Sequence, residues 1–256
     1  MCLLGGKDRL WPVPGEKQLA RVVAIAPAYN EKGKIGRVVA KTPRGLVGEV
    51  VVVSDGSDDG SDQEAKDAGA TVLRHEKVLG VGAAIRTGID YALAKGYDII
   101  VVMAGNDKDD PNQIERLIEP IVERGFDYVQ GSRYASGGAY GAMPMHRTVL
   151  TRAYPWLVRL ITGFPITDAT NGFRAIRAGM LRDERIKLHQ EWLDRGELEY
   201  YLQLQAIRLG FKVCEVPVTK IYPDISRYDN YTKIRPFVDW LGNLRPIFYL
   251  TLGIKH

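Results

Sequence analysis

The sequence has few cysteines and no long apolar run, and each absence excludes a class of protein. Cys2 and Cys214 are the two cysteines among 256 residues, and neither has CxxC or Cys/His spacing. We therefore expect no structural zinc, no disulfide framework and a reducing, cytoplasmic setting. The longest apolar stretch, residues 247–254, is interrupted by Thr251 and Gly253. A transmembrane helix needs about 20 apolar residues, so no segment is predicted to cross a bilayer.

An excess of charge of one sign is also missing. The chain has 35 Lys and Arg against 31 Asp and Glu, a formal net charge of +4. With 45% hydrophobic and 26% charged residues, it has the proportions of an ordinary globular protein. We therefore expect no nucleic-acid partner. Residues 1–20 lack the apolar core of a signal peptide and are expected to form a loose leader.

Apolar runs alternate with amphipathic segments in the first half of the chain, which predicts parallel strands joined by crossover helices. The expected strands are 21–27, 49–54, 71–74 and 98–103, and the expected helices are 32–42, 61–69 and 80–95. Ligands of such sheets bind beyond the carboxyl ends of the strands. The loops 28–31, 55–60 and 105–110 are therefore expected to converge on one site.

The second half has a looser pattern. It predicts helices at 111–124, 147–162 and 197–209, strands at 128–131, 173–176 and 212–216, and a glycine-rich loop at 134–144. In the tail, apolar residues recur at helical spacing: Val238, Leu241, Leu244, Phe248 and Leu252. Pro236 and Pro246 are expected to divide this tail into two short helices that lie on a membrane surface. The alternative is that the same face is ordinary core.

Two loops carry a pair of motifs. Pro27-Ala-Tyr-Asn-Glu31 follows the first strand, and Asp55-Gly-Ser-Asp-Asp-Gly-Ser61 follows the second. The pair resembles the family 2 glycosyltransferases of the GT-A fold, in particular dolichol-phosphate mannosyltransferase and related polyprenol-phosphate sugar transferases. This resemblance implies an α/β GT-A fold, with a Rossmann-like, mostly parallel sheet flanked by helices. It divides the chain into a nucleotide-sugar half (21–110), an acceptor half (111–232) and C-terminal amphipathic helices (233–256).

The resemblance also implies an activity. The chain is expected to be an inverting hexosyltransferase that moves mannose or glucose from a GDP- or UDP-linked donor. The expected acceptor is a polyprenyl phosphate or another lipid-linked group, reached through peripheral contact with the cytoplasmic face of a membrane.

Six residues are assigned to the nucleotide sugar by this resemblance, five of them here and Asn106 with the metal below. Pro27, Tyr29, Glu31 and Asp55 are expected around the nucleoside, where a carboxylate can accept hydrogen bonds from a base edge or a ribose. Arg86 belongs to the segment 79–88, which matches the glycine-rich helix start of the family.

A divalent metal, Mg²⁺ or Mn²⁺, is implied at the end of the fourth strand. Asp107-Lys-Asp109 has the Asp-x-Asp spacing of GT-A enzymes, so Asp107 and Asp109 are the expected ligands. Counting back from Pro111, as the usual family spacing suggests, instead reaches Ala104 and Asn106. Asn106 is therefore expected near the nucleotide sugar as a further oxygen donor.

Four residues are assigned to catalysis. In the related enzymes two arginines bind the acceptor phosphate, and these positions match Arg133 and Arg147; the planar guanidinium suits phosphate. Asp168 lies in a segment that resembles the floor of the acceptor site, and it is the first base expected for a hydroxyl acceptor. Lys233 is expected to stabilise the departing diphosphate.

Three alternatives stay open from the residues alone. The acceptor is a soluble hydroxyl compound, or the protein binds a sugar nucleotide without turnover, or it is an NAD-dependent oxidoreductase. The last requires a third glycine at position 85, where the chain has Ile85.

Overall fold

One large sheet organises the molecule. The computed structural model describes residues 20–141, 143, 145–222 and 238–255. The sheet has seven strands in the order β3-β2-β1-β4-β7-β5-β8. In chain order they are β1 Val22–Ala28, β2 Glu49–Asp55, β3 Thr71–His75, β4 Ile99–Val102, β5 Tyr128–Ser132, β7 Arg174–Arg177 and β8 Val213–Pro217. Only β7 among them is antiparallel to its neighbours.

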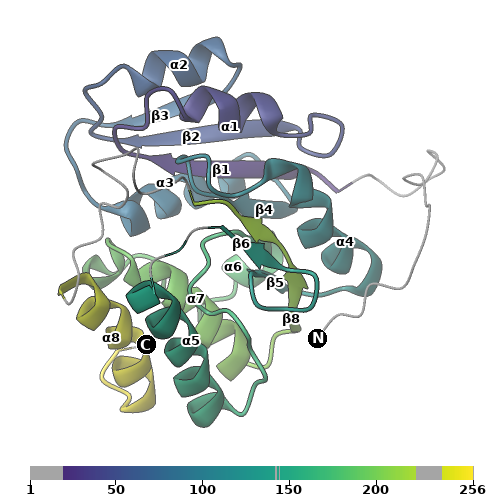
Figure 1. Ribbon diagram of the computed structural model, residues 1–256, viewed down its shortest axis with the longest axis vertical. Helices are drawn as coiled ribbons and strands as arrows, with labels where there is room; N and C mark the ends of the chain where they lie inside the picture. The colour runs from purple at the N-terminus through teal and green to yellow at the C-terminus, as the bar shows by residue number, and fades with distance from the viewer. Residues whose placement is uncertain (1–19, 142, 144, 223–237, 256) are drawn as a thin grey trace.

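Helices cover both faces of this sheet (Figure 1). On one face lie α1 Ile35–Lys41, α2 Ser61–Asp67 and α4 Ile114–Arg124, and the last follows the 3₁₀ turn η1 Pro111–Gln113. On the other face lie α3 Val81–Ala94, α5 Met145–Thr162, α6 Ala178–Leu181, η2 Glu191–Leu193, α7 Glu197–Arg208 and α8 Val238–Thr251. The short strands β6 Ala139–Tyr140 and β9 Thr219–Lys220 form a separate parallel pair.

Successive side chains of β1 enter different cores. Val23 and Ile25 pack in the cluster that contains Ile85 and Ile89 of α3. Ala24 packs in the opposite cluster with residues of α1 and α4. Because both faces are covered by helices, the central strands need apolar residues at every position. This explains why they read as continuous Val and Ile runs in the sequence.

The mixed α/β architecture with a mostly parallel sheet is confirmed, and the predicted elements of the first half agree with the structure to within a few residues. The short strands β6 and β9 and the reversed direction of β7 were not predicted.

One prediction about the tail is wrong. The helix α8 runs through Pro246 instead of being divided there. Ile247 and Leu250 are buried and Leu244 packs beside them against the core, and such tertiary packing stabilises a helix that its sequence alone would not support. Phe248 and Leu252 of the same helix are exposed. Of the predicted membrane face, Leu244 therefore packs against the core, while Phe248 and Leu252 lie at the surface.

Candidate functional site

The three loops expected to converge do meet at the carboxyl ends of β1, β2 and β4. The N–H of Asn30 donates to the Ser57 hydroxyl (3.1 Å), and its side-chain oxygen accepts from the N–H of Asp58 (3.0 Å). The N–H of Gly105 donates to the carbonyl of Pro27 (3.2 Å). These bonds join the two motif loops to each other and to the loop after β4.

Asp55 is buried at the end of β2 and holds the segment that leads into α3. Its carboxylate accepts from the backbone N–H groups of Leu79 and Gly80, each at 2.8 Å. It also contacts Nδ1 of His75 at 2.8 Å, and Nε2 of that ring lies 3.0 Å from the Thr87 hydroxyl. Asp55, which is predicted to hold the nucleoside, thus also fixes the backbone of the segment that leads into α3.

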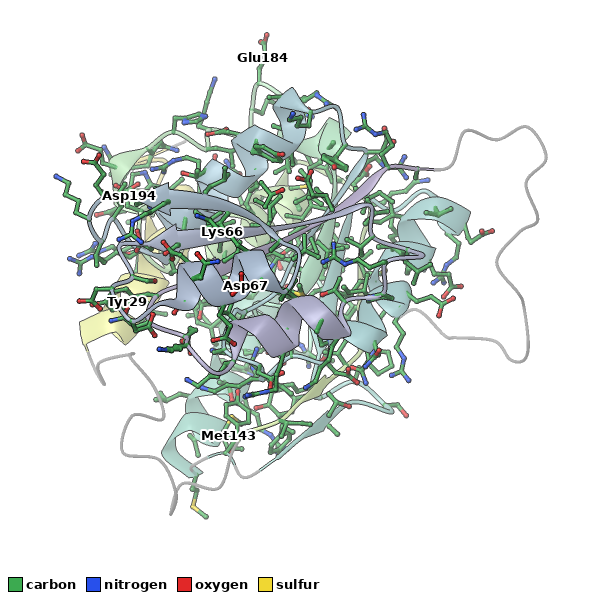
Figure 2. The ribbon with its side chains drawn as sticks, turned by 90° about the horizontal axis from the view of Figure 1, so that it is seen from above. Tyr29, Lys66, Asp67, Met143, Glu184 and Asp194 are labelled. Carbon is green, nitrogen blue, oxygen red and sulfur yellow. The ribbon has the colours of Figure 1, made fainter. Side chains whose placement is uncertain are left out.

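The other residues assigned to the nucleotide sugar lie in two places. Tyr29 is 40% exposed at the motif loop, and the Glu31 carboxylate pairs with Lys34 at 2.7 Å. Arg86 instead bonds to Asp194 (2.5 Å) and to the carbonyl of Leu188 (3.3 Å). In the view of Figure 2, Tyr29 and Asp194 lie along the same edge of the molecule.

The glycines before Arg86 have a packing role that the sequence did not reveal. A Cβ at Gly82 would lie 2.0 Å from the carbonyl oxygen of Leu193, and one at Gly80 would lie 2.3 Å from that of Asp194. The N–H of Ala83 donates to Asp194 O at 2.9 Å. The glycine motif therefore lets the segment around Asp194 dock directly on the start of α3.

Asp107 and Asp109 point to different parts of the molecule. The Asp107 carboxylate pairs with Arg37 (2.7 Å) and Lys41 (2.9 Å), both on α1. The Asp109 carboxylate is buried, with one oxygen 2.5 Å from Lys220 Nζ and the other accepting from the N–H of Ala104 at 3.0 Å. The side-chain oxygen of Asn106 accepts from the N–H of Lys108 at 3.3 Å.

This arrangement does not fit a divalent cation. Mg²⁺ and Mn²⁺ need several oxygen ligands that converge on one point, whereas all four carboxylate oxygens of Asp107 and Asp109 already contact donors of the chain. Within residues 20–222 and 238–255, as far as they are described, no group of three or more His, Cys, Asp or Glu is placed to hold a metal. No step below passes through one.

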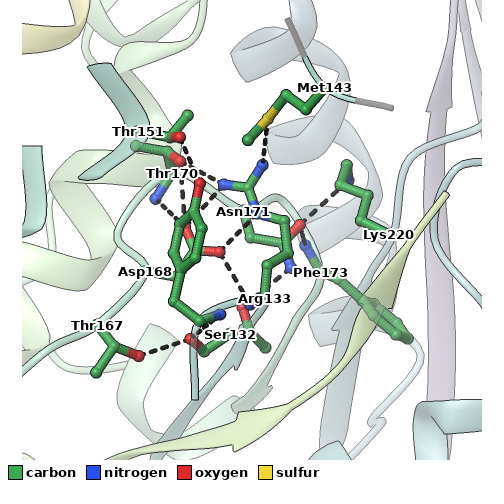
Figure 3. Close-up of polar contacts among 12 residues, drawn as sticks. Ser132, Arg133, Met143, Thr151, Thr167, Asp168, Thr170, Asn171, Phe173 and Lys220 are labelled. Carbon is green, nitrogen blue, oxygen red and sulfur yellow. Dashed lines mark hydrogen bonds and ion pairs between the residues drawn. The ribbon is translucent and has the colours of Figure 1, made fainter. Parts of the chain in front are cut away.

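In the acceptor half, Arg133 and Asp168 form a buried pair (Figure 3). Arg133 Nε and Nη2 donate to the two Asp168 oxygens at 2.6 and 2.8 Å, and the side chains are 2% and 0% exposed. The other guanidinium nitrogen donates to the hydroxyl of Tyr222, and Nη2 also donates to that of Thr170. Burial opposes the charge, but the hydrogen bonds and charge of Asp168 outweigh it and raise the pKa of Arg133. The guanidinium therefore stays charged.

Glu215 holds the backbone of the segment that carries Asp168. Its carboxylate accepts from the N–H of Asp168 (2.8 Å) and from the N–H and hydroxyl of Thr167, and burial raises its pKa. Asp168 would have to break a two-point contact with Arg133 before it accepted a proton from a substrate. The geometry thus favours an acceptor that needs no base.

Lys220 is a buried charged residue beside the predicted metal ligand Asp109, and the sequence did not indicate this contact. Its ammonium contacts the side-chain oxygen of Asn171 (Figure 3) and the carboxylate of Asp109. The Asn171 amide donates to the carbonyl of Gly131 at 3.0 Å. The available signal was a single lysine in the mostly apolar stretch from Val216 to Ile221.

Two assigned residues have no described side chain. Arg147 lies in α5, but its side chain is not among those described, and Lys233 lies outside the described residues. Their roles stay predictions.

Comparison with known proteins decides the family. A model of the family described as glycosyl transferase family 2 matches residues 23–184, which is more than half of the chain. The chain belongs to glycosyl transferase family 2. The prediction from the two motif loops is confirmed.

This family 2 glycosyltransferase has close relatives of named activity. It is 33% identical to the undecaprenyl-phosphate mannosyltransferase of Micrococcus luteus, over 80% of this chain and 86% of that one. It is 31% identical to the polyprenol monophosphomannose synthase of Mycolicibacterium smegmatis, over 81% and 84% of the two chains.

Solved structures share the fold of this glycosyltransferase. Glucosyl-3-phosphoglycerate synthase of Mycobacterium tuberculosis superposes with a TM-score of 0.65 at 20% identity, over 93% of this chain and 82% of that one. A further structure of that enzyme contains Mn²⁺, UDP and its glucosylated product. At this identity the likeness shows the fold alone.

Proposed function

We propose that this family 2 glycosyltransferase transfers a hexose from a nucleoside diphosphate sugar to a polyprenyl phosphate, with inversion at the anomeric carbon. The observation that carries the proposal is the buried ion pair of Arg133 and Asp168. Asp168 is the carboxylate expected to act as a base, and both of its oxygens already accept hydrogen bonds from Arg133. The two mannosyltransferase relatives support mannose as the sugar and a lipid phosphate as the acceptor. Another relative, from Methanococcus voltae and 27% identical, is named for UDP-N-acetylglucosamine, so GDP and UDP donors both need testing.

The reaction needs no proton transfer if the acceptor is a phosphate. A phosphate oxygen of the acceptor attacks C1 of the sugar while the bond from C1 to the donor's β-phosphate oxygen breaks. The nucleoside diphosphate leaves with the electron pair, through a transition state with oxocarbenium character. A phosphate monoester is already mostly dianionic at neutral pH, so the nucleophile is formed before it binds.

The two halves of the site divide the work in this proposal. The loops that carry Pro27, Tyr29, Glu31 and Asp55 hold the nucleoside of the donor. On the acceptor side Arg133 and Arg147 attract the lipid phosphate, and Arg133 also fixes the loop that carries Asp168. Lys233 assists departure of the diphosphate. The contacts of Asp107 and Asp109 do not fit the divalent cation that the family resemblance implies, and the binding measurements below test whether the donor needs one.

The helix α5 has an exposed surface that suits contact with a membrane. Four apolar side chains, each more than half exposed, follow one stripe of this helix: Met145, Val149, Trp156 and Leu160. The helix has no Asp or Glu, and Arg152 and Arg159 are exposed along it. An exposed apolar stripe with basic neighbours fits the surface of an anionic bilayer. No described helix is long and apolar enough to span one.

A transfer assay tests the function. The purified protein is incubated with radiolabelled GDP-mannose, UDP-glucose or UDP-N-acetylglucosamine and with undecaprenyl phosphate in liposomes, and label is extracted into organic solvent. We expect label in the lipid phase with one donor. 3-Phosphoglycerate and mannose serve as soluble acceptors in parallel. Label transferred only to a soluble acceptor, or donor binding without any transfer, contradicts the proposal.

A further inference from the structure

The ammonium of Lys220 contacts the carboxylate of Asp109, which the sequence had assigned to a metal ion. Its Nζ is 2.5 Å from one oxygen of Asp109 and 3.1 Å from the side-chain oxygen of Asn171. Asp109 ends the loop after β4, and Asn171 reaches the carbonyl of Gly131 at the end of β5. The positive charge thus sits between the loop after β4 and the end of β5, two strands that have β7 between them in the sheet.

The backbone holds this lysine in place. Asp109 and Lys220 form an antiparallel bridge, and the N–H of Ile221 donates to the carbonyl of Lys108 at 2.8 Å. One residue earlier, the N–H and hydroxyl of Thr219 bond to the side chain of Gln113. The strand β9 is therefore fastened along the loop after β4, and Lys220 enters the site from a fixed position.

A contribution to stability does not by itself explain the buried ion pair of Lys220 and Asp109. The side chains of Lys220 and Asp109 are 9% and 2% exposed, and desolvation of two charges can exceed the energy of their attraction. An ammonium has three N–H groups, and the described contacts use two of them, with Asp109 and Asn171. A phosphate oxygen is a suitable acceptor for the third.

We propose that Lys220 supplies the positive charge that stabilises the donor's diphosphate, and that this glycosyltransferase binds its donor without a divalent cation. The inference rests on the proposed function, because it concerns the same donor site. In this arrangement Asp109 holds and orients the ammonium instead of ligating a metal, and Asp107 is neutralised separately by Arg37 and Lys41.

Nucleotide binding with and without metal tests the proposal. The affinity of the full chain for GDP and for UDP is measured by calorimetry in EDTA and then with Mn²⁺ or Mg²⁺. We expect the affinity for the preferred nucleotide to differ by less than about threefold between EDTA and added metal. If a metal ion bridged the protein and the diphosphate, its removal by EDTA would weaken binding by about tenfold or more. Binding of the native protein that requires the metal would overturn the proposal.

Variants of the ion pair give a second readout that a merely structural lysine would not affect. Lys220→Met should weaken binding in EDTA by about tenfold, and Mn²⁺ should then partly restore it, because the Asp109 carboxylate is released. The double variant Lys220→Met with Asp109→Asn removes both charges and so leaves no unpaired buried carboxylate. This variant should bind the nucleotide weakly with or without metal. Lys220→Arg should keep metal-free binding.

Lys41→Met is the matched control, since it removes an exposed lysine from Asp107 and should leave binding unchanged. Native affinity retained in the double variant would show that Lys220 does not touch the diphosphate, and the proposal would fail.

The results separate this inference from the proposed function. Metal-free binding that depends on Lys220, without sugar transfer to the lipid, overturns the function alone. Transfer to the lipid that occurs only with Mn²⁺ overturns the inference alone. If neither nucleotide binds under any condition, both are wrong.

Discussion

At the scale of single residues, the acceptor side of the site depends on one guanidinium. Arg133 donates to Asp168, Thr170 and Tyr222, which come from two separate stretches of chain. An arginine satisfies these acceptors together because its donors are fixed in one plane. A residue assigned to the acceptor from the sequence is thus also an internal support of the fold.

This double role makes a testable prediction for Arg133. Arg133→Ala leaves the Asp168 carboxylate buried and unpaired, so we expect the free energy of unfolding to fall by about 3–5 kcal/mol in urea titrations. Arg133→Lys should fold better but turn over more slowly, with donor affinity unchanged. Arg152→Ala, which removes an exposed arginine that bonds to Tyr140, is the control and should change stability by less than about 0.5 kcal/mol. Reduced donor affinity in Arg133→Lys would place this residue in the nucleotide site instead.

At the scale of elements, β2, β3 and α3 are joined by one carboxylate at the start of β2. Glu49 accepts from the hydroxyls of Thr71, Tyr91 and Tyr97. Burial opposes its charge, but these hydrogen bonds prevail and lower the pKa of Glu49 below its usual 4.5. Burial, together with the hydrogen bond to Glu49, raises the pKa of Tyr97 to about 12.

The lowered pKa predicts a loss of stability in acid. The folded protein binds a proton at Glu49 less readily than the unfolded chain, so the stabilisation is complete above the unfolded pKa and is lost as the pH falls through the folded one. Glu49→Gln should therefore cost about 1–3 kcal/mol at about pH 7 and less at about pH 3.5. Urea unfolding at both pH values measures this, with the exposed Glu76→Gln as control. An equal cost at both values would contradict the assignment.

The helix α5 carries a prediction about membranes. Trp156→Glu with Leu160→Glu places two charges on the exposed stripe and should abolish flotation with anionic liposomes, because each charge must stay in water. The control is Val122→Glu, at an exposed apolar residue of α4 on the other side of the sheet. Binding of the native protein should weaken as salt is raised. If a chain ending at Tyr231 loses flotation while the α5 variant keeps it, the tail makes the contact instead.

At the scale of the whole molecule, the sequence could predict the features that depend on short local patterns. The Val and Ile runs of β1, β2 and β4 and the two motif loops were sufficient for the fold class and the family. The direction of β7 was not predictable, because a buried strand has the same composition whether it runs parallel or antiparallel. Lys220 was not predictable either, since its partners Asp109 and Asn171 lie 111 and 49 residues away along the chain.

The reversed strand β7 has a consequence for synthesis of the chain. Its partners β4 and β5 are both made before it, and β7 lies between them in the finished sheet. On the ribosome, each of these strands therefore waits with an unpaired edge until residues 174–177 emerge. Unpaired apolar edges promote aggregation of nascent chains. The edge that β5 presents to β8 stays unpaired for longer still, until residues 213–217 emerge.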